Sequence, residues 1–248
     1  MNRKNKIKAY LKILKLSTIK EMLDEILIKA EQEKLSYQEL LFALLKKEVD
    51  VRQEKAYNRR FKQSNLDKYK TIDIFDFSFQ DSITKAQANQ LLDFEWLEQA
   101  FNLVFLGPPG IGKSHLANAI GLKAIASGYK VFFISMDQLI KVLKTQEVIK
   151  KSQQQLKRIK KADLVVIDEL GYLPITKEEA NLFFQLITDF YEQTSIIITS
   201  NKSFSKWAEV LGDQVITTAI LDRIMHHSEI FNLTGKSYRL ENREKIIK

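Results

Sequence analysis

The amino-acid sequence predicts an α/β fold built on a central parallel sheet and preceded by a small all-helical domain. From residue 101 onward, short apolar runs alternate with longer helical stretches, a pattern typical of a parallel sheet with helices on both faces. Before Gly107 the chain has no glycine or proline, and a stretch without such breakers favours helices.

The first seventy residues carry helical patterns. Apolar residues recur at helical spacing over residues 19–30, and a second run extends from residue 40 to about 61. Two capping-box patterns predict where these helices begin: Thr18 with Glu21, and Ser36 with Glu39. We place the domain boundary near residue 70, which gives domains 1–70 and 71–248.

Residues 71–82, TIDIFDFSFQDS, open the second domain. Phe75, Phe77 and Phe79 alternate with polar residues. A period of two is typical of a short strand, but it fits equally an extended linker whose aromatic rings lie on the following domain.

Five strands are predicted in the second domain: Asn102–Leu106, Lys130–Ser135, Leu164–Ile167, Ser195–Thr199 and Glu229–Leu233. The helical stretches between them include Lys113–Ser127, Gln138–Lys161 and Lys177–Gln193. The strand 164–167 is apolar throughout, as expected of a strand buried at the centre of a parallel sheet.

Residues 107–114 match the phosphate-binding pattern G-x-x-x-x-G-K-[ST] at every fixed position. Glycines let backbone N–H groups turn toward a phosphate chain, and the N-terminus of the following helix adds its positive end. A strand before the motif and a helix after it supply the required context. The expected nucleotide contacts are Gly107, Pro108, Pro109, Gly110, Ile111, Gly112, Lys113 and Ser114.

Within this loop, Lys113 is expected to reach the β- and γ-phosphates, and Ser114 to offer its hydroxyl to Mg²⁺. His115 follows directly; we expect it to face the sheet or the edge of the nucleotide, and count it with the nucleotide-binding residues.

A pair of carboxylates, Asp168 and Glu169, follows the apolar strand 164–167. Ligands of open α/β sheets bind at the carboxyl ends of the strands, which is where this pair is predicted to lie. We expect Asp168 to hold Mg²⁺ through water, and Glu169 to orient or activate the water that attacks the γ-phosphate.

Two further residues allow two interpretations each. Asn201, after the strand 195–199, would position water beside the γ-phosphate, or would start a turn and cap a helix around residues 204–210. Arg223 would be an ordinary salt-bridge partner at a helix end, or an arginine finger that reaches a neighbouring subunit's γ-phosphate.

The net charge of +8 is unevenly distributed. Residues 1–70 hold 18 Lys+Arg and 10 Asp+Glu, whereas residues 71–248 hold 21 of each. This segregation indicates contact with a polyanion, with a solvated lysine-rich surface as the alternative. The candidate DNA-binding residues lie where the charge is densest, although cations at a helix end also complement its dipole: Arg52, Lys55, Arg59, Arg60 and Lys62.

The composition excludes several classes of protein. Without cysteine there is no disulfide framework and no thiolate zinc site. The three histidines are too few and too badly spaced for a convincing metal cluster, and we assign no chemistry to His226 and His227. No apolar run is long enough to cross a bilayer, and the basic N-terminus never becomes a continuous apolar segment. We therefore expect a cytoplasmic protein without a membrane partner.

Several segments together resemble the IstB-type helper ATPases of bacterial insertion sequences, which are AAA+ proteins related to DnaC-type helicase loaders. The likeness covers residues 70–241, and it rests on GPPGIGKSHLANAI, DLVVIDELGYLP, EEANLFFQLI, IIITSN, FSKW and AILDRIMHHSEIFNLTGKSYRL. FDFSFQ resembles that family's linker. Most of these motifs are generic to AAA+ ATPases, whereas ELGYLP and HH-x-x-x-x-N-x-x-x-x-SYR are particular to this family.

The resemblance implies an ATPase that assembles on double-stranded DNA, uses ATP and Mg²⁺, and assists a cognate transposase. It matches Asn201 to the sensor position, Arg223 to the arginine-finger position and Arg239 to a second-sensor-like position. A finger acting in trans implies self-association into an ATP-dependent oligomer. The sequence shows no integrase-like acidic triad, so strand transfer is expected to belong to the transposase.

Two other functions stay open at this point. A DnaC-type replicative helicase loader shares the AAA+ core, but ELGYLP and the basic N-terminal helices favour the transposition helper. A stand-alone P-loop enzyme, such as a small-molecule kinase, would need a substrate-specific lid that the sequence does not show, and would leave the basic N-terminus unexplained.

Overall fold

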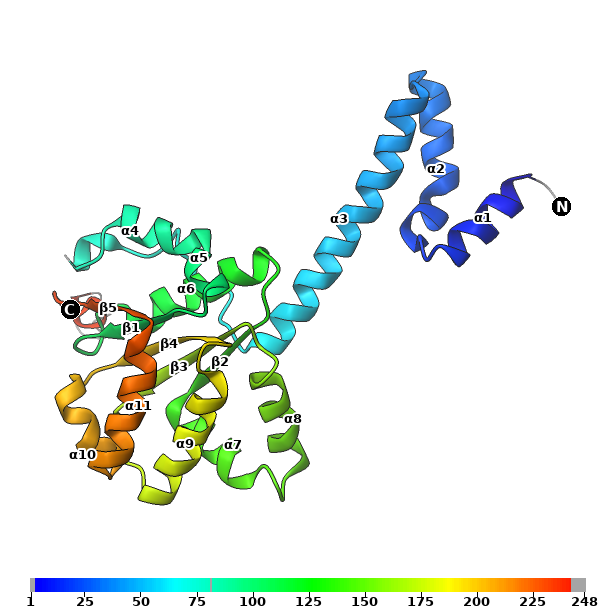
Figure 1. Ribbon diagram of the computed structural model, residues 1–248. Helices are drawn as coiled ribbons and strands as arrows, with labels where there is room; N and C mark the ends of the chain where they lie inside the picture. The colour runs from blue at the N-terminus through cyan, green and yellow to red at the C-terminus, as the bar shows by residue number, and fades with distance from the viewer. Residues whose placement is uncertain (1–2, 81, 242–248) are drawn as a thin grey trace, which may run out of the picture. The chain divides into compact units, whose positions relative to one another are not determined.

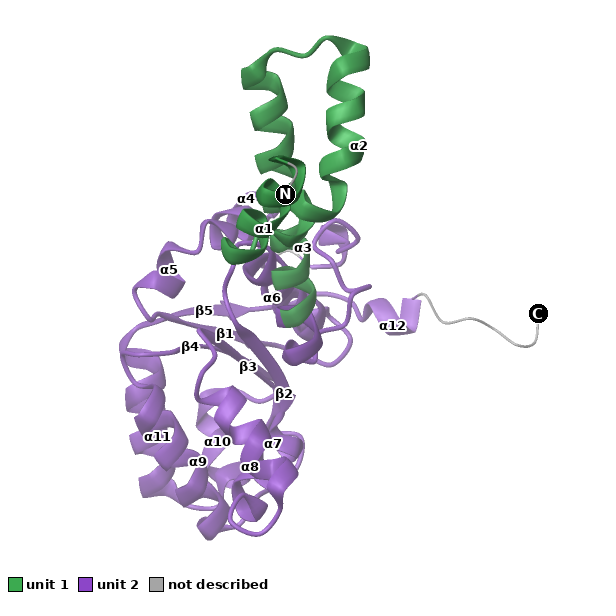
Figure 2. Cartoon of the chain, turned by 90° about the vertical axis from the view of Figure 1, so that its right-hand side faces the viewer, with its two compact units in different colours: residues 1–59 green, residues 60–248 purple. Residues whose placement is uncertain are grey.

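The structure, a computed structural model, describes residues 3–80 and 82–241 (Figure 1). The chain divides into two compact units, Met1–Arg59 and Arg60–Lys248, hereafter the helical unit and the ATPase unit (Figure 2). The division lies ten residues before the position expected near residue 70. The last turn of a long helix belongs to the second unit, where Arg60 Nε donates to the Ile125 carbonyl at 3.2 Å.

The helical unit holds α1 (Arg3–Ile13), α2 (Ser17–Glu33) and most of α3 (Tyr37–Ser64). The capping box predicted at the start of α3 is confirmed. The N–H of Ser36 donates to Glu39 Oε2 at 2.8 Å, and the N–H of Glu39 donates to Ser36 Oγ at 3.3 Å. The local sequence was therefore sufficient to predict where α3 begins.

The capping box predicted from Thr18 and Glu21 is wrong. The helix α2 has no side-chain cap of its own. Instead, Glu48 of α3 accepts a hydrogen bond from the N–H of Ile19 at 3.0 Å. Glu48 is buried, and Arg52 Nε donates to its other oxygen at 2.8 Å. A tertiary contact thus replaces the local box.

The ATPase unit is built on a five-stranded parallel sheet with the order β2-β3-β4-β1-β5. The predicted fold class is confirmed, and the strands are β1 (Asn102–Leu106), β2 (Val131–Ser135), β3 (Leu164–Leu170), β4 (Ser195–Ser200) and β5 (Ser228–Asn232). β3 is fully buried over its first four residues, as predicted, but runs three residues further. β4 lies between β1 and β3, so the ends of these three strands are neighbours.

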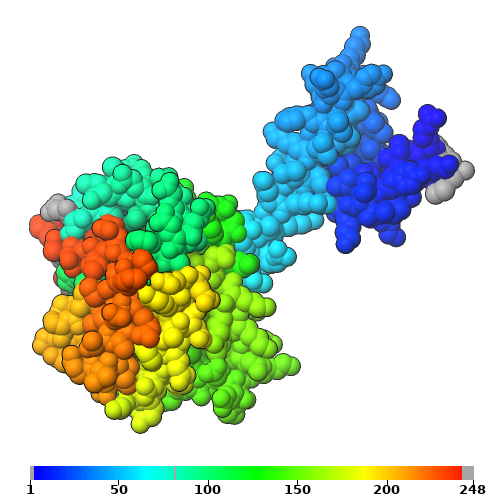
Figure 3. Space-filling model, in the orientation of Figure 1, coloured from blue at the N-terminus to red at the C-terminus, as the bar shows by residue number. Residues whose placement is uncertain are grey.

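Helices cover both faces of the sheet (Figures 1 and 2). One face carries α4 (Lys85–Gln90), α5 (Glu95–Glu98) and α6 (Lys113–Ala126). The other carries α7 (Met136–Thr145), α8 (Lys150–Ile159), α9 (Lys177–Phe190), α10 (Trp207–Leu211) and α11 (Gln214–His226). Figure 3 shows α11, α9 and α8 in that order across the outer surface. None of the described helices combines the length and apolar character that crossing a bilayer requires.

The helical stretch predicted over Gln138–Lys161 is helical for most of its length, but it is divided into α7 and α8. Ile149, just before α8, has an extended backbone with φ −105° and ψ 113°. One continuous helix of that length would extend about 36 Å and leave the sheet. The reversal lets Leu143 of α7 and Leu156 of α8 join the same core.

The segment 71–80 is a linker without a regular strand. It contains a short 3₁₀ turn, Phe77–Phe79, and Gln80 forms an isolated antiparallel bridge with Gly235. Phe75 is buried, and its ring meets that of His115 edge-on at 5.4 Å. Of the two predicted alternatives, the structure therefore supports the linker whose aromatic residues lie on the ATPase unit.

Candidate nucleotide-binding site

The phosphate-binding loop lies between β1 and α6, at the carboxyl end of the sheet (Figure 1). The N–H of Gly107 donates to the carbonyl of Ser200 at 3.1 Å, which ties the start of the loop to the end of β4. The motif therefore has both the strand–loop–helix context and the position that a phosphate site requires.

The segment 233–241, which follows β5, packs against the loop, and the N–H of Tyr238 donates to the Gly110 carbonyl at 3.0 Å. Gly107 has φ +146°, and a Cβ there would lie 2.2 Å from the Leu233 carbonyl oxygen. Gly110 has φ +83°, and a Cβ there would lie 2.1 Å from Ser237 Oγ. No side chain fits at either position, so glycine is required there for the segment after β5 to approach the loop this closely.

Lys113 extends back into the loop. Its Nζ donates to the carbonyl oxygens of Gly107 at 2.7 Å and Pro108 at 2.8 Å. Burial lowers the pKa of Lys113, the charge of Asp168 opposes that effect, and the charge of Arg239 adds to it. The structure thus brings Arg239 of α12 (Tyr238–Glu241) into the electrostatic field of the loop.

Asp168 and Glu169 are linked through one hydroxyl. Thr199, the fifth residue of β4, donates from Oγ1 to Asp168 Oδ1 at 2.5 Å. Thr199 Oγ1 also accepts a hydrogen bond from the N–H of Glu169 at 3.0 Å. Thr199 and Asp168 are both buried. The Thr199 hydroxyl therefore fixes the orientation of the Asp168 carboxylate relative to the backbone of Glu169.

Glu169 has an unusual backbone conformation. Its φ is +63°, and the register between β3 and β4 shifts between Ile167 and Leu170. A non-glycine residue with positive φ costs on the order of 1–3 kcal/mol, and such strain concentrates at functional sites. The bulge exposes Glu169, whereas Asp168 stays buried.

Asn201 follows β4, and Ser114 is the second residue of α6. Asn201 follows β4 directly and is exposed, and the residue that precedes the next helical turn is Ser203. The structure therefore does not support the interpretation of Asn201 as a helix cap. Ser114 lies in the first turn of α6 and is half-buried.

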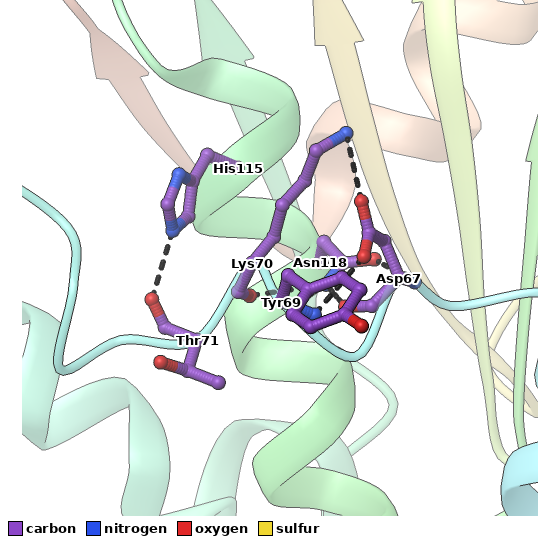
Figure 4. A network of polar contacts seen from close by, with 6 residues as sticks. All are labelled: Asp67, Tyr69, Lys70, Thr71, His115 and Asn118. Carbon is purple, nitrogen blue, oxygen red and sulfur yellow. Dashed lines mark hydrogen bonds and ion pairs between the residues drawn. The ribbon is translucent and has the colours of Figure 1, made fainter.

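His115 and Asn118 connect α6 to the segment that follows α3 (Figure 4). His115 Nε2 lies 2.8 Å from the Thr71 carbonyl oxygen, so its hydrogen bond goes to this segment rather than to the loop. Asn118 is buried; its Nδ2 donates to the carbonyls of Asp67 at 2.8 Å and Lys70 at 3.0 Å, and its Oδ1 accepts from the N–H of Asp67. The helix that begins at the phosphate-binding loop thus holds residues 67–71.

Arg223 lies near the amino ends of the strands, at the opposite end of the sheet from the phosphate-binding loop. It lines a small cavity together with Asn102 and Ile196, at the starts of β1 and β4. Its guanidinium lies 4.7 Å from the centre of the Phe184 ring, and its Nη1 donates to the Ala219 carbonyl at 3.0 Å. Because β1 spans about 16 Å, Arg223 is too far from its own loop to contact a nucleotide there.

The two adjacent histidines have partners that the sequence did not indicate. His226 Nδ1 lies 2.8 Å from Tyr191 Oη, and His227 Nε2 lies 3.7 Å from Glu192 Oε1. Ligand atoms of His226, His227 and Glu192 all lie within 4.8 Å of one another. This cluster lies at the same end of the sheet as Arg223, away from the phosphate-binding loop.

The five basic residues predicted to bind DNA do not form one set. Arg52 pairs with buried Glu48, and Arg60 donates to the carbonyl of Ile125. The other three are exposed, and have no ion pair or side-chain hydrogen bond with any residue that the structure describes: Lys55, Arg59 and Lys62. Their spacing of four and three residues places these three on one side of α3.

Sequence reasoning missed Thr199 and Asn118. In both cases the polar residue adjoins apolar neighbours: Thr199 follows three isoleucines of β4, and Asn118 stands within LANAI of α6. Buried polar side chains in native proteins are almost always hydrogen-bonded, so each pattern signalled a partner without saying which one.

This fold and loop define a P-loop nucleotide-binding protein of the AAA+ class. The crystal structure of the DnaC helicase loader aligns with a TM-score of 0.55 at 23% identity, over 67% of this chain and 98% of that one. The crystal structure of DnaI aligns with a TM-score of 0.57 at 18% identity, over 69% of this chain and 96% of that one. At these identities the likeness shows the fold alone.

The chain belongs to the family described as IstB-like ATP binding protein, which matches over residues 9–246. The ATP-binding protein of insertion sequence IS5376 from Geobacillus stearothermophilus is 43% identical over 242 residues, which are 98% of this chain and 96% of the relative. That of insertion sequence IS21 from Pseudomonas aeruginosa is 39% identical over 241 residues, which are 97% and 91% of the two chains. The resemblance stated from the sequence is thus confirmed.

Proposed function

We propose that this protein hydrolyses ATP with Mg²⁺ and assembles on double-stranded DNA as an ATP-dependent oligomer that assists the transposase of its insertion sequence. The observation that carries the proposal is the carboxylate pair Asp168 and Glu169, linked by Thr199 next to the phosphate-binding loop. Relatives that match along nearly the full chain are insertion-sequence proteins, which favours this role over that of a helicase loader.

The residues of the loop fit Mg²⁺-ATP. The Ser114 hydroxyl and the Asp168 carboxylate are hard oxygen donors of the kind that Mg²⁺ prefers. The ammonium of Lys113 already holds carbonyl oxygens inside the loop, and phosphate oxygens are stronger acceptors for it. Glu169 is exposed toward solvent and is the group assigned to orient the attacking water.

Arg223 supports action between subunits. Because Arg223 lies near the amino ends of the strands, it is too far away to contact a nucleotide bound to its own loop. Contact between Arg223 and a γ-phosphate therefore requires a neighbouring protomer. Asn201 and Arg239 complete the proposed site, since Asn201 follows the strand beside the loop and the charge of Arg239 acts on Lys113.

Two substitutions test the proposed ATPase. In Glu169→Gln, size and hydrogen bonding are kept but the base is lost, so ATP should still bind while turnover falls by a factor on the order of 10² or more. In Lys113→Ala, ATP binding itself should weaken, because the cation facing the phosphates is removed. Binding by fluorescent nucleotide and turnover by phosphate release separate the two. Parent-like turnover in Glu169→Gln would remove Glu169 from the mechanism.

The DNA part of the proposal rests on the exposed cations of α3. Phosphate contacts release counterions, and each contributes about 0.9 to the log–log dependence of affinity on salt. Lys55→Ala combined with Arg59→Ala should weaken binding to all duplex sequences alike and reduce this slope by about two per protomer. The matched control is Lys46→Ala with Lys47→Ala, on the same helix. Equal slopes in the two double variants would contradict phosphate contacts at Lys55 and Arg59.

A further inference from the structure

A basic pocket lies in the ATPase unit, between the start of β2, the end of α8 and the last turn of α3. Its volume is about 450 Å³. All of its lining residues fall within 60–248, and its cations are Arg60, Lys130, Lys157, Arg158 and Lys161. Because it lies where β2 begins, it is at the opposite end of the sheet from the phosphate-binding loop, and it is not part of the nucleotide site.

The cations of this pocket are unneutralised. Lys130, Lys157, Arg158 and Lys161 are exposed, and none forms an ion pair with a carboxylate in the described part of the chain. Lys160, on the same helix, shows the contrast, because its Nζ lies 2.7 Å from Asp189. Like charges held together repel one another, and an anion that binds among them relieves this repulsion.

The sequence around the pocket adds to this charge. Residues 150–161 contain six lysines or arginines and no aspartate or glutamate. The nearest carboxylate along the chain, Asp163, accepts a hydrogen bond from the backbone N–H of Lys130 at 2.7 Å and is not among the lining residues. The net charge of the ATPase unit is small in spite of this local cluster of cations. The helical unit, residues 1–59, holds 14 Lys+Arg and 9 Asp+Glu, which leaves only +3 for residues 60–248.

The floor of the pocket decides which kind of anion fits. Val131, Phe132 and Ala162 form a floor with little exposed surface, and the rim carries the ammonium and guanidinium groups together with the Gln63 amide. An acidic protein segment would gain little there, because the apolar side chains of the floor expose too little surface to anchor it. A phosphodiester backbone needs only cations and hydrogen-bond donors, and these are what the rim supplies.

We propose that the basic pocket binds the phosphate backbone of duplex DNA, which gives the ATPase unit a DNA contact of its own. This rests on the proposed function, because it assumes that the protein binds DNA, but it goes beyond the cations of α3. Each protomer would then hold the duplex through two separate surfaces, one on the exposed side of α3 and one beside β2. Arg60, which the sequence grouped with the first surface, belongs to the second.

The test is the salt dependence of DNA binding by the full chain carrying Lys157→Ala and Arg158→Ala. With a duplex of arbitrary sequence as the probe, the log–log slope should fall by about two per protomer and the affinity should drop for all sequences alike. Two controls accompany it. Lys150→Ala with Lys151→Ala removes the same charge from the other end of α8, and Lys157→Arg with Arg158→Lys keeps the charge; both should retain the parent slope.

The outcomes separate the two proposals. If the parent binds no DNA, the proposed function fails. If the parent binds DNA and Lys157→Ala with Arg158→Ala keeps both its slope and its affinity, only the basic pocket is refuted. The proposal for the basic pocket would also be refuted if Lys157→Ala with Arg158→Ala loses binding to polyglutamate but keeps its DNA binding. That result would indicate that the pocket binds an acidic protein partner. Unchanged ATP affinity and thermal stability in this variant are expected, since both side chains are exposed and far from the loop.

Discussion

Thr199 shows how much one buried hydroxyl controls in this site. It donates to Asp168 and accepts from the backbone of Glu169, so it joins the residue assigned to Mg²⁺ and the residue assigned to water. Glu169 has φ +63°, a conformation that persists only where surrounding contacts determine it. We infer that the hydrogen bond from its N–H to Thr199 is one of those contacts.

Replacement of this hydroxyl provides a prediction at the residue scale. Thr199→Val keeps the shape of the side chain but leaves Asp168 without a donor and the Glu169 N–H without an acceptor. Turnover should fall by a factor of about 10–100, because small displacements of catalytic groups have effects of this size. ATP affinity should change little. Thr199→Ser, which keeps the hydroxyl, should restore most of kcat; a Thr199→Val variant with parent kcat would show that the geometry is not needed.

At the scale of elements, α2 is capped by another helix. Glu48 of α3 is buried and accepts from the N–H of Ile19. Burial raises the pKa of Glu48, but the hydrogen bonds from Ile19 and Arg52 outweigh it, and the net pKa lies below its ordinary value of 4.5. The stabilisation by this contact is therefore complete above that pH and is lost as the pH falls through the folded-state pKa.

Glu48→Gln tests this contact. It should lower the stability of the helical unit at pH 7 by about 1–3 kcal/mol, the range for a buried charged hydrogen bond that is weakened. The difference from the parent should shrink on acidification, because protonation of Glu48 removes the same charge in the parent. Thermal unfolding at neutral and acidic pH measures both effects. Glu54→Gln, exposed on the same helix, is the control, and an equal loss there would argue against a specific cap.

α6 is a second element with two roles. It begins at Lys113 in the phosphate-binding loop, and through Asn118 it holds the carbonyls of Asp67 and Lys70 in the segment after α3 (Figure 4). A displacement of α6 would therefore move this segment as well.

For the whole molecule, the decisive prediction concerns cooperation between protomers. Arg223→Ala should bind ATP but lose turnover by a factor on the order of 10³, because an arginine finger contributes at least that much. Mixing it with Lys113→Ala should restore part of the activity, since one protomer supplies the intact loop and its neighbour supplies the arginine. Phosphate release from the mixture, compared with each variant alone, measures the rescue. A mixture that assembles fully but stays inactive would make Arg223 a structural residue.

Local sequence was sufficient wherever the determining residues are close together in the chain. The glycines and Lys113 of the phosphate-binding loop lie within seven residues, and Asp168 and Glu169 directly follow an apolar strand. The parallel sheet followed from alternating strands and helices for the same reason. The break between α7 and α8 was missed, because no glycine or proline marks it and the core, rather than local propensity, requires the reversal.

The fold class, the phosphate-binding loop and the carboxylate pair were therefore predictable from the sequence, because each depends on neighbouring residues and on periodicity. Which distant groups meet follows from the three-dimensional packing alone. The strand order puts Thr199 beside Asp168. The packing of α11 places Arg223 near the amino ends of the strands, away from its own loop. Packing assigns Glu48 to the start of α2, and gathers Arg60 with the cations of α8. These partners are 29 or more residues apart in the chain, and spacing along a sequence carries no information on which distant surfaces come into contact.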